Sequence, residues 1–254
     1  MRRILILGGT AEARQLAARL AARADLAVTL SLAGRTASPA PQPVPVRIGG
    51  FGGAQSLAEY LSSERIAALI DATHPYAATI SANAARAAQR SNTPLLALRR
   101  PPWIRRLGDN WIEVADVDCA VATIGSAPRR VFVALGRNEL APFLRAPQHH
   151  YVVRSIDPID PPLALPSAAY ITGRGPFDEI DEHALLEQHR IDRIVAKNSG
   201  GQSSYGKIAA ARALGLPVIM LRRPVLPQVA AVETVEDAVA WLDHARTASI
   251  ARGV

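Results

Sequence analysis

The chain has 254 residues, 49% of them hydrophobic and 20% charged, and its formal net charge is +7. This composition excludes a disordered or collagen-like chain and provides enough apolar material for a large core. The lone Cys119 excludes a disulfide framework, and no apolar run reaches the roughly 20 residues of a membrane span or begins the chain as a signal peptide. We therefore expect a soluble, cytoplasmic protein without membrane contact.

Strands and helices alternate through the first half of the chain. The apolar run 4–7 ends in Gly8 and predicts a buried parallel strand, and the amphipathic segment 11–24 predicts a helix. Further strands are expected at 26–32, 67–72 and 94–98, and further helices at 56–62 and 77–90. The segment 39–45 is rich in proline, which favours a loop or a sheet edge. Such alternation predicts a doubly wound parallel sheet.

The second half of the chain repeats features of the first. The apolar segment 130–136 lies 127 residues after the segment 3–9, and an acid follows each at the same spacing. Residues 94–101 read PLLALRRP and residues 217–224 read PVIMLRRP, each after a strand, a polar loop and a helix. We interpret this as two related halves; the alternative is a similar strand–helix composition that arose twice by chance.

The expected fold is α/β, with two Rossmann-like parallel-sheet halves and a ligand cleft between them. We expect an N-terminal domain at 1–125, which binds the cofactor, and a C-terminal domain at 126–254, which contributes substrate and cofactor loops. A helix near 235–245 is expected to close the fold. Ligands of open parallel sheets bind beyond the carboxyl ends of the strands, so the loops at those ends are the candidate sites.

The turn between the first strand and the first helix carries Gly8, Gly9, Thr10 and Glu12. Glycines let backbone amides approach a phosphate, and the N-terminus of a helix adds partial positive charge. The turn departs from the full G-x-G-x-x-G pattern because Thr10 and Ala13 replace its second and third glycines. We expect it to bind a dinucleotide or a phosphate; the alternative role for Thr10 is a helix cap.

The second strand ends without the acid that usually binds the ribose hydroxyl of NAD. Ser31 and Arg35 stand there instead. An arginine at this place pairs with the 2′-phosphate of NADP, which favours NADPH over NADH. The alternative is an ordinary surface arginine.

Three proton-handling groups follow a buried strand. Asp71, His74 and Tyr76 lie close to Thr73 in the chain, and Pro75 suits the first turn of a helix. Histidine titrates near neutrality, and tyrosine donates a proton or anchors a ligand. No serine or cysteine nucleophile with a base is evident, so a hydrolase is disfavoured.

Two short glycine-rich loops in the second half each carry a cation. The first contains Thr172, Gly173, Arg174 and Gly175, and the second contains Lys197, Asn198, Ser199, Gly200 and Gly201. Backbone amides beside a cation suit an anionic ligand, while tight turns with a solvated cation are the alternative. The P-loop pattern is missing, which disfavours an ATPase, and His149 and His150 lack the spaced partners of a metal site.

The basic excess favours a small anionic ligand. Lys+Arg outnumber Asp+Glu by 29 to 22, and nearly all of the basic residues are arginines. They are scattered and are not interleaved with aromatic residues, which disfavours nucleic acid as a partner. Arginine forks bind carboxylates and phosphates, so a polyanionic small molecule is the expected partner.

The motifs, in this order, resemble the precorrin-6A reductase family of cobalamin biosynthesis. They are GGTAEA at 8–13, DATHPYA at 71–77, TGRGPF at 172–177, AKNSGG at 196–201 and GLPVIMLRRP at 215–224. The resemblance implies an NADPH-dependent reduction of one double bond in a corrin precursor, an anionic tetrapyrrole with many carboxylate arms. The family also has relatives that act on the cobalt-loaded macrocycle, and the sequence leaves both substrates open.

The resemblance and the strand ends together suggest roles for individual residues. The catalytic candidates are His74, Tyr76 and Lys197. The cofactor NADPH is expected at Gly8, Gly9, Thr10, Glu12, Ser31, Arg35, Asp71 and Thr73. The substrate is expected at Thr172, Gly173, Arg174, Gly175, Asn198, Ser199, Gly200 and Gly201, and no metal ligand is expected.

Two other interpretations compete with this one. A short-chain dehydrogenase needs Tyr-x-x-x-Lys, but Ile80 and Ala209 stand four residues after Tyr76 and Tyr205. A non-enzymatic NADP-binding sensor is compatible with the sequence, although the second set of polar loops favours a second small ligand. A monomer and an oligomer are both compatible with it.

Overall fold

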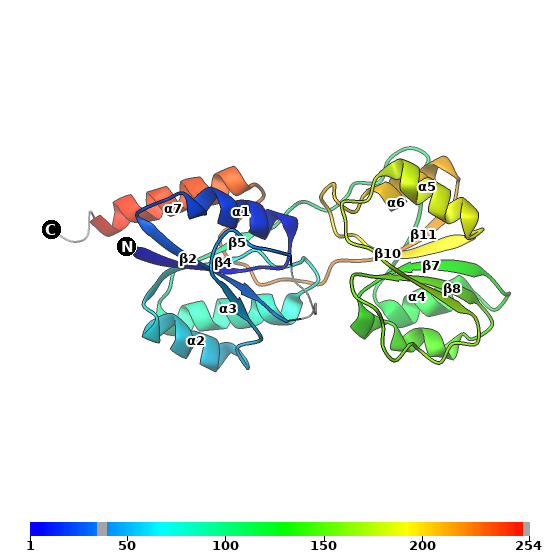
Figure 1. The fold of residues 1–254 in the computed structure, drawn as a ribbon, viewed down its shortest axis with the longest axis horizontal. Helices are drawn as coiled ribbons and strands as arrows, with labels where there is room; N and C mark the ends of the chain where they lie inside the picture. Colours follow the sequence, from blue (N-terminus) through cyan, green and yellow to red (C-terminus); the bar gives the residue numbers. More distant parts are fainter. Residues whose placement is uncertain (35–39, 251–254) are drawn as a thin grey trace. The chain divides into compact units, whose positions relative to one another are not determined.

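A computed structural model describes the backbone of residues 1–34 and 40–250 and the side chains up to residue 244 of those ranges. Internal contacts divide it into two compact units: unit 1 is Met1–Pro101 with the described part of Pro224–Val254, and unit 2 is Pro102–Arg223. Each unit is a sheet with helices on both faces (Figure 1). In the described ranges no helix is long and apolar enough to cross a membrane.

Unit 1 is built on a six-stranded parallel sheet. Its strands, in spatial order, are β12 (Ala231–Val232), β5 (Leu95–Leu98), β4 (Ile66–Asp71), β1 (Arg2–Leu7), β2 (Leu26–Leu32) and β3 (Val46–Ile48). All neighbouring pairs are parallel. Helices α1 (Ala11–Ala21) and α7 (Val235–Ile250) cover one face, and α2 (Ala54–Ser63) and α3 (Ala78–Ser91) cover the other (Figure 1). The strand order is that of a Rossmann fold.

Unit 2 repeats this strand order. Its strands, in spatial order, are β6 (Asn110–Val114), β11 (Pro217–Leu221), β10 (Arg193–Lys197), β7 (Arg130–Ala134), β8 (His150–Ser155) and β9 (Ala168–Thr172). Helices α5 (Glu179–Gln188) and α6 (Gly206–Ala213) cover one face, and α4 (Val117–Ile124) lies on the other (Figure 1). Where unit 1 has α1, unit 2 has two short 3-10 turns, η1 (Arg137–Glu139) and η2 (Ala141–Arg145). The expectation of two Rossmann-like halves of parallel sheet is confirmed.

The two units exchange their edge strands β6 and β12. Each of these strands lies in one unit and follows, in the chain, the last strand of the other unit's continuous part. After β5 the chain enters unit 2 and forms β6, which pairs with β11. After β11 it returns to unit 1 and forms β12, which pairs with β5. A helix follows each of these strands: α4 in unit 2 and α7 in unit 1. The chain therefore crosses between the units twice.

This exchange places the unit boundaries elsewhere than the expected division between residues 125 and 126. That division falls inside unit 2, between α4 and β7. The physical reason is pairing: residues 110–114 form a ladder with Pro217–Leu221, and α7 packs against α1. Unit 1 is therefore discontinuous in sequence, with its last strand and helix at the C-terminal end of the chain.

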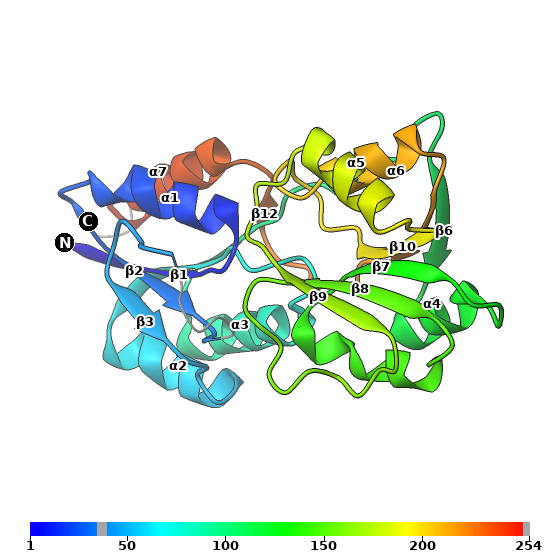
Figure 2. The same cartoon turned by 45° about the vertical axis from the view of Figure 1, so that its right-hand side comes forward.

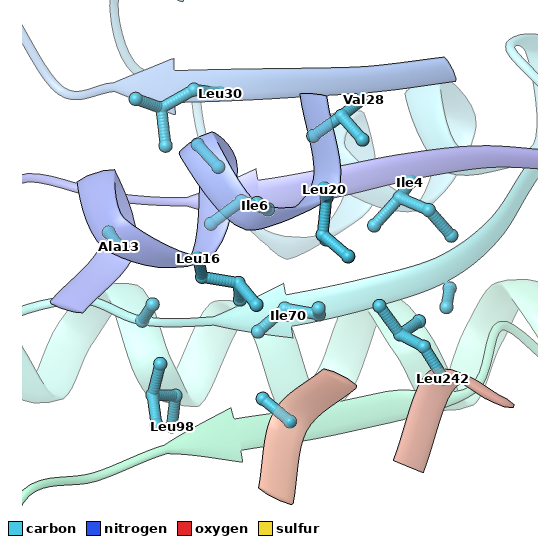
Figure 3. Close-up of a cluster of buried hydrophobic side chains, with 14 of the residues drawn as sticks. Ile4, Ile6, Ala13, Leu16, Leu20, Val28, Leu30, Ile70, Leu98 and Leu242 are labelled. Carbon is cyan, nitrogen blue, oxygen red and sulfur yellow. The ribbon is translucent and has the colours of Figure 1, made fainter. Parts of the chain in front are cut away.

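The core of unit 1 reflects the side-chain periods of its strands and helices, two residues in a strand and about four in a helix. Ile4 and Ile6 of β1 point to one face of the sheet and pack with Leu16 and Leu20 of α1, and Leu242 of α7 closes the same cluster (Figure 3). The intervening residues of β1 pack on the other face against α2 and α3. Successive side chains of a strand point to opposite faces of the sheet, so β1, apolar at every position from 4 to 7, is buried on both faces. Residues four apart on a helix share a face, so Leu16 and Leu20 meet the sheet together.

The register of the sheet brings the loops of interest to one edge. Leu7, Ser31, Arg47 and Asp71 lie side by side in the ladders of β1, β2, β3 and β4. Because all of these strands are parallel, the loops that follow them gather at the same carboxyl edge. The edge strand β3, next to β2 (Figure 2), is short and was not expected from the sequence.

Candidate functional site

The turn between β1 and α1 is shaped by two glycines for two different reasons. Gly9 has a φ of +112°, a conformation that L residues rarely adopt. A β-carbon on Gly8 would lie 2.6 Å from Cδ1 of Leu30, so a side chain there would require the buried Leu30 side chain of β2 to move. The two glycines therefore let the chain enter α1 directly over the strand ends.

Thr10 begins α1 and joins its turn to the next strand of the sheet. Its Oγ1 accepts a hydrogen bond from the Ala13 amide at 3.1 Å and donates to the Ala72 carbonyl at 2.8 Å. The cap that the sequence offered as the alternative for Thr10 is confirmed. The turn and the end of β4 are consequently held together beside the N-terminus of α1.

Glu12, in the first turn of α1, forms an ion pair with Arg100. The Nη1 of Arg100 lies 2.6 Å from Oε2 of Glu12, and the side chains are 12% and 22% exposed. Arg100 follows β5 and was not among the expected site residues. Its sequence signal was the repeated Arg-Arg-Pro that ends both 94–101 and 217–224. The pair balances the charge of a carboxylate that stands where an anionic ligand would approach the helix.

The end of β2 contributes one described side chain. Ser31 is buried and lines a pocket at the carboxyl edge of the sheet. Arg35, the candidate for a 2′-phosphate, lies outside the described residues. No acidic residue occurs in the sequence 31–36, SLAGRT, that leaves this strand.

The structure brings the polar residues after β4 together. The buried carboxylate of Asp71 accepts hydrogen bonds from Thr73, at 2.6 Å from its Oγ1 and 3.2 Å from its amide. Nδ1 of His74 accepts from the Tyr76 amide at 3.3 Å, and the two rings lie 5.7 Å apart. A neutral His74 ring with this bond carries its proton on Nε2. The loop thus has the groups for proton transfer in one turn of chain.

A pocket of about 170 Å³ opens beside this loop. It is lined by Leu7, Gly8, Ser31, Ala33, Gly49, Gly50, Phe51, Gly52, Gly53, Leu57, Thr73, Ile80 and Asn83. Its volume is below the roughly 300–1,000 Å³ of a complete small-molecule site. The pocket therefore suits one ring of a larger ligand. The glycine-rich segment 49–53 was missed from the sequence, although four glycines in five residues were its signal.

In unit 2, Lys197 at the end of β10 forms an ion pair with Glu139 of η1. The same carboxylate accepts a hydrogen bond from the Gly136 amide at 2.9 Å. Lys197 therefore joins the ends of two neighbouring strands, β7 and β10. A catalytic role for this ammonium group would have to be performed from within the ion pair.

The Asn198–Gly201 loop is fixed by a tryptophan that sequence reasoning missed. The Asn198 amide side chain accepts from the Trp103 backbone N–H at 2.8 Å and donates to the Trp103 carbonyl at 3.0 Å. The indole N–H of Trp103 donates to the Gly201 carbonyl at 2.7 Å. Arg223 donates to the carbonyls of Asn198 and Ser199 at 2.9 and 3.1 Å. Both segments that enter and leave unit 2 thus hold this loop, and Gly200 completes it with a φ of +68°.

The other expected substrate loop of unit 2 follows β9. Thr172 and Arg174 are exposed there, and the amide of Gly173 donates to the Ser155 carbonyl at 3.0 Å. A β-carbon on Gly175 would lie 2.9 Å from the carbonyl oxygen of Ser203, so this loop touches the segment that leads into α6. The loops after β9 and β10 therefore lie at the same edge of the sheet of unit 2.

A lysine is buried behind these loops. Lys207 of α6 is 4% exposed, and its Nζ donates to the Ser204 carbonyl at 2.5 Å and lies 5.1 Å from the ring centre of Trp103. Burial and, to a smaller extent, nearby Arg154 together lower the pKa of Lys207 to about 7, against the opposing effect of Glu182. Arg154 and Glu182 form a buried ion pair of their own. Within the described residues, no group of three or more metal-binding side chains gathers.

Known proteins are similar to the chain over nearly its full length. A family model described as Precorrin-6x reductase CbiJ/CobK matches residues 3–243. A "Precorrin-6A reductase" of Sinorhizobium sp is 56% identical over 95% of this chain and 93% of its own length. Another, from Rhodobacter capsulatus, is 47% identical over 97% of this chain and 98% of its own length.

A solved structure extends the similarity to the fold. The "CobK precorrin-6A reductase" superposes with a TM-score of 0.91 at 46% identity, over 96% of this chain and 97% of that one. The family resemblance expected from the sequence motifs is confirmed. The chain therefore belongs to the precorrin-6x reductase family.

Proposed function

We propose that the protein reduces one double bond of precorrin-6A with NADPH, in cobalamin biosynthesis. The observation that carries this proposal is near full-length identity of 43–56% to relatives named precorrin-6A reductase. Relatives named cobalt-precorrin-6A reductase are 28–30% identical. This gap favours the metal-free macrocycle as the substrate.

The reductase family and the Rossmann sheet point to a nicotinamide cofactor, and unit 1 fits one. The positive φ of Gly9 and the start of α1 offer backbone amides to a pyrophosphate. Ser31 and Thr73 flank a pocket suited to one ring of the dinucleotide. The missing acid after β2, together with Arg35, supports NADPH over NADH. When bound, the nicotinamide supplies a hydride.

Residues of unit 2 are suited to bind the carboxylate arms of the macrocycle. Arg174 is an exposed cation on the loop after β9, and Thr172, Gly173 and Gly175 shape that loop. Ser199, Gly200 and Gly201, with the Asn198 amide anchored on Trp103, present the backbone of the loop after β10. Preorganised loops of this kind reduce the entropic cost of ordering on binding.

A proton donor is proposed in the loop after β4. Nδ1 of His74 accepts a hydrogen bond from the Tyr76 amide, which leaves the proton of a neutral ring on Nε2, and Asp71 fixes Thr73 beside it. Donation to a ring nitrogen of the macrocycle would make the adjacent carbon a better hydride acceptor. If His74→Ala and Tyr76→Phe both keep full turnover, this loop does not contain the donor.

The test is an anaerobic assay of the purified protein with NADPH and precorrin-6A. Loss of nicotinamide absorbance and the change of the macrocycle spectrum are followed together, and NADH and cobalt-precorrin-6A serve as parallel arms. Coupled reduction with NADPH and precorrin-6A supports the proposal. Faster reduction of the cobalt-loaded substrate, or equal use of NADH, would contradict the corresponding part of it.

A further inference from the structure

An ion pair is buried in unit 2, next to the loop that follows β9. Arg154 of β8 and Glu182 of α5 have side chains that are only 8% and 2% exposed. The contact is bidentate: Nη1 of Arg154 donates to Oε1 of Glu182, and Nη2 donates to Oε2 at 3.0 Å. A buried ion pair adds little stability beyond that of apolar residues of the same size, so stability alone does not explain its presence.

The guanidinium of Arg154 also contacts two aromatic rings. Its Cζ lies 3.7 Å from the ring centre of Phe177, in the loop after β9, and 5.0 Å from that of Phe132, a core residue of β7. The bidentate bond to Glu182 fixes the plane of the guanidinium, and a guanidinium over an aromatic face is attracted to it. Arg154 therefore links the ring of a loop residue to the sheet of unit 2.

The ring of Phe177 lies against the backbone of the loop after β9. A β-carbon on Gly173 would lie 3.3 Å from Cε1 of this ring, and a β-carbon on Gly175 would lie 3.3 Å from its Cδ2. The two glycines thus pack directly on the ring. Arg174, the exposed cation of this loop, stands between them. The place of the Phe177 ring therefore sets the place of the backbone that carries Arg174.

The segment that leads from the loop after β10 into α6 is tied to the same residue. The amide of Phe177 donates to the Ser203 carbonyl at 3.0 Å. A β-carbon on Gly206, the first residue of α6, would lie 2.6 Å from the carbonyl oxygens of Phe177 and Asp178. The two loops that carry the proposed contacts to the macrocycle are therefore joined at Phe177, the residue on which Arg154 stacks.

Resting on the proposed function, we propose that Arg154 is a positioning residue for the anionic substrate, which through Phe177 holds the loops after β9 and β10 in the conformation that binds it. The other role for the Arg154–Glu182 pair is stability of unit 2 alone. The two roles predict different results when the pair is replaced by apolar residues. If the pair only stabilises the unit, a replacement that keeps stability also keeps substrate binding. If Arg154 positions the loops, stability is kept and substrate binding is weakened.

The first experiment compares Tm, KM and kcat in the double variant Arg154→Met/Glu182→Leu. Because no buried charge loses its partner, Tm should stay close to that of the unmodified protein. The KM for precorrin-6A at saturating NADPH should rise about tenfold, since the loops are no longer held in place before binding. The value of kcat and the Kd of NADPH should not change, because Arg154 does not touch the reacting atoms and lies in unit 2. Leu186→Ala, a core change in the same helix as Glu182, is the control: Tm should fall and KM should not change.

A second variant tests the ring and leaves the ion pair in place. Phe177→Leu removes the aromatic face on which Arg154 stacks, and it should raise the KM for precorrin-6A by a similar factor. Phe177→Leu added to the double variant should raise KM no further, because both changes remove the same contact. Effects on KM that multiply would show that Arg154 does not act through Phe177, and would overturn the proposal.

Hydrogen exchange tests the positioning without turnover. In the double variant, amides of residues 172–177 and 199–204 should exchange faster than in the unmodified protein, while those of the core strands β7 and β10 should keep their rates. An unchanged KM in the double variant, a fall in kcat at saturating substrates, or unchanged exchange in both loops would each overturn the proposal. An unmodified protein that does not reduce precorrin-6A refutes the proposed function, and the exchange rates still show whether Arg154 holds the loops.

Discussion

The buried Lys207 predicts that the stability of the protein rises with pH above neutrality. Lys207 is 4% exposed, and its folded-state pKa is about 7 against an ordinary value of 10.5. Between these two values the unfolded chain binds a proton that the folded protein does not bind. The free energy of unfolding therefore increases with pH across this window and is lower below it.

The size of the effect follows from the two pKa values. Each pH unit in the window contributes about 1.4 kcal/mol, so the full interval from about 7 to 10.5 corresponds to about 5 kcal/mol as an upper estimate. Measurement up to pH 9.5 avoids the tyrosine region, because burial raises the pKa of Tyr151 to about 12 while unfolded tyrosine titrates near 10. An increase of about 3 kcal/mol is expected from pH 7 to pH 9.5.

The assay is urea denaturation of three proteins across this range of pH. Lys207→Met has no group to titrate and Lys207→Arg stays charged, so neither should gain the stability that the unmodified protein gains. The charged partners Arg154 and Glu182 remain in all three. Comparison of slopes cancels the contributions of other groups. If the Lys207→Met curve runs parallel to that of the unmodified protein, the ammonium is not neutralised by burial and the argument fails.

Three further predictions concern contacts at the strand ends and one buried histidine. Arg100→Met leaves Glu12 unpaired beside the N-terminus of α1 and should weaken NADPH binding about tenfold in a fluorescence titration. The double variant Arg100→Met/Glu12→Gln should restore NADPH binding. An unchanged Kd in Arg100→Met would show that the ion pair does not contribute to NADPH binding. Trp103→Phe removes the indole hydrogen bond to the Gly201 carbonyl and should raise the KM for precorrin-6A several-fold, with the Kd of NADPH unchanged. If the KM for precorrin-6A and the Kd of NADPH rise together, the substitution has disturbed the fold and not this loop alone. Burial lowers the pKa of His149 below 6.5, so its neutral form contributes stability above pH 6.5 that is lost as the pH falls. His149→Gln should therefore flatten the acid side of a profile of Tm against pH. Equal acid sensitivity of the variant and the unmodified protein would refute this.

The elements that the sequence predicted are those with a clear apolar run or period. Residues 4–7 form a continuous apolar run, and Leu16 and Leu20 repeat at four residues, so β1 and α1 were found where they occur. Strand β3 has three residues after a proline-rich segment, which are too few to establish a period. The strand exchange leaves no local signal at all, because it depends on which fifth strand receives residues 110–114 and 231–232.

The sequence predicted which loops form the candidate site, but not the long-range contacts that hold those loops in place. Strand ends and glycines indicated the turn at Gly9 and the loop after β4, since both follow from chain order and residue type. The anchors Arg100 and Trp103 lie far from their partners in sequence, 88 residues for the pair with Glu12 and 95 for the pair with Asn198. Residue type alone does not indicate which distant carboxylate or amide an arginine or a tryptophan backbone will meet.

The two halves differ in the segments that follow β1 and β7, although the sequences of these segments are alike. Each strand is followed by a glycine and a glutamate, Glu12 in unit 1 and Glu139 in unit 2. In unit 1 this segment opens α1, eleven residues long, whereas in unit 2 it forms η1, a 3-10 turn of three residues. Aligned peptide dipoles and free amides at a helix start favour a phosphate, and a single 3-10 turn provides little of either. The difference supports dinucleotide binding by unit 1, and it leaves the loops after β9 and β10 of unit 2 for the anionic substrate.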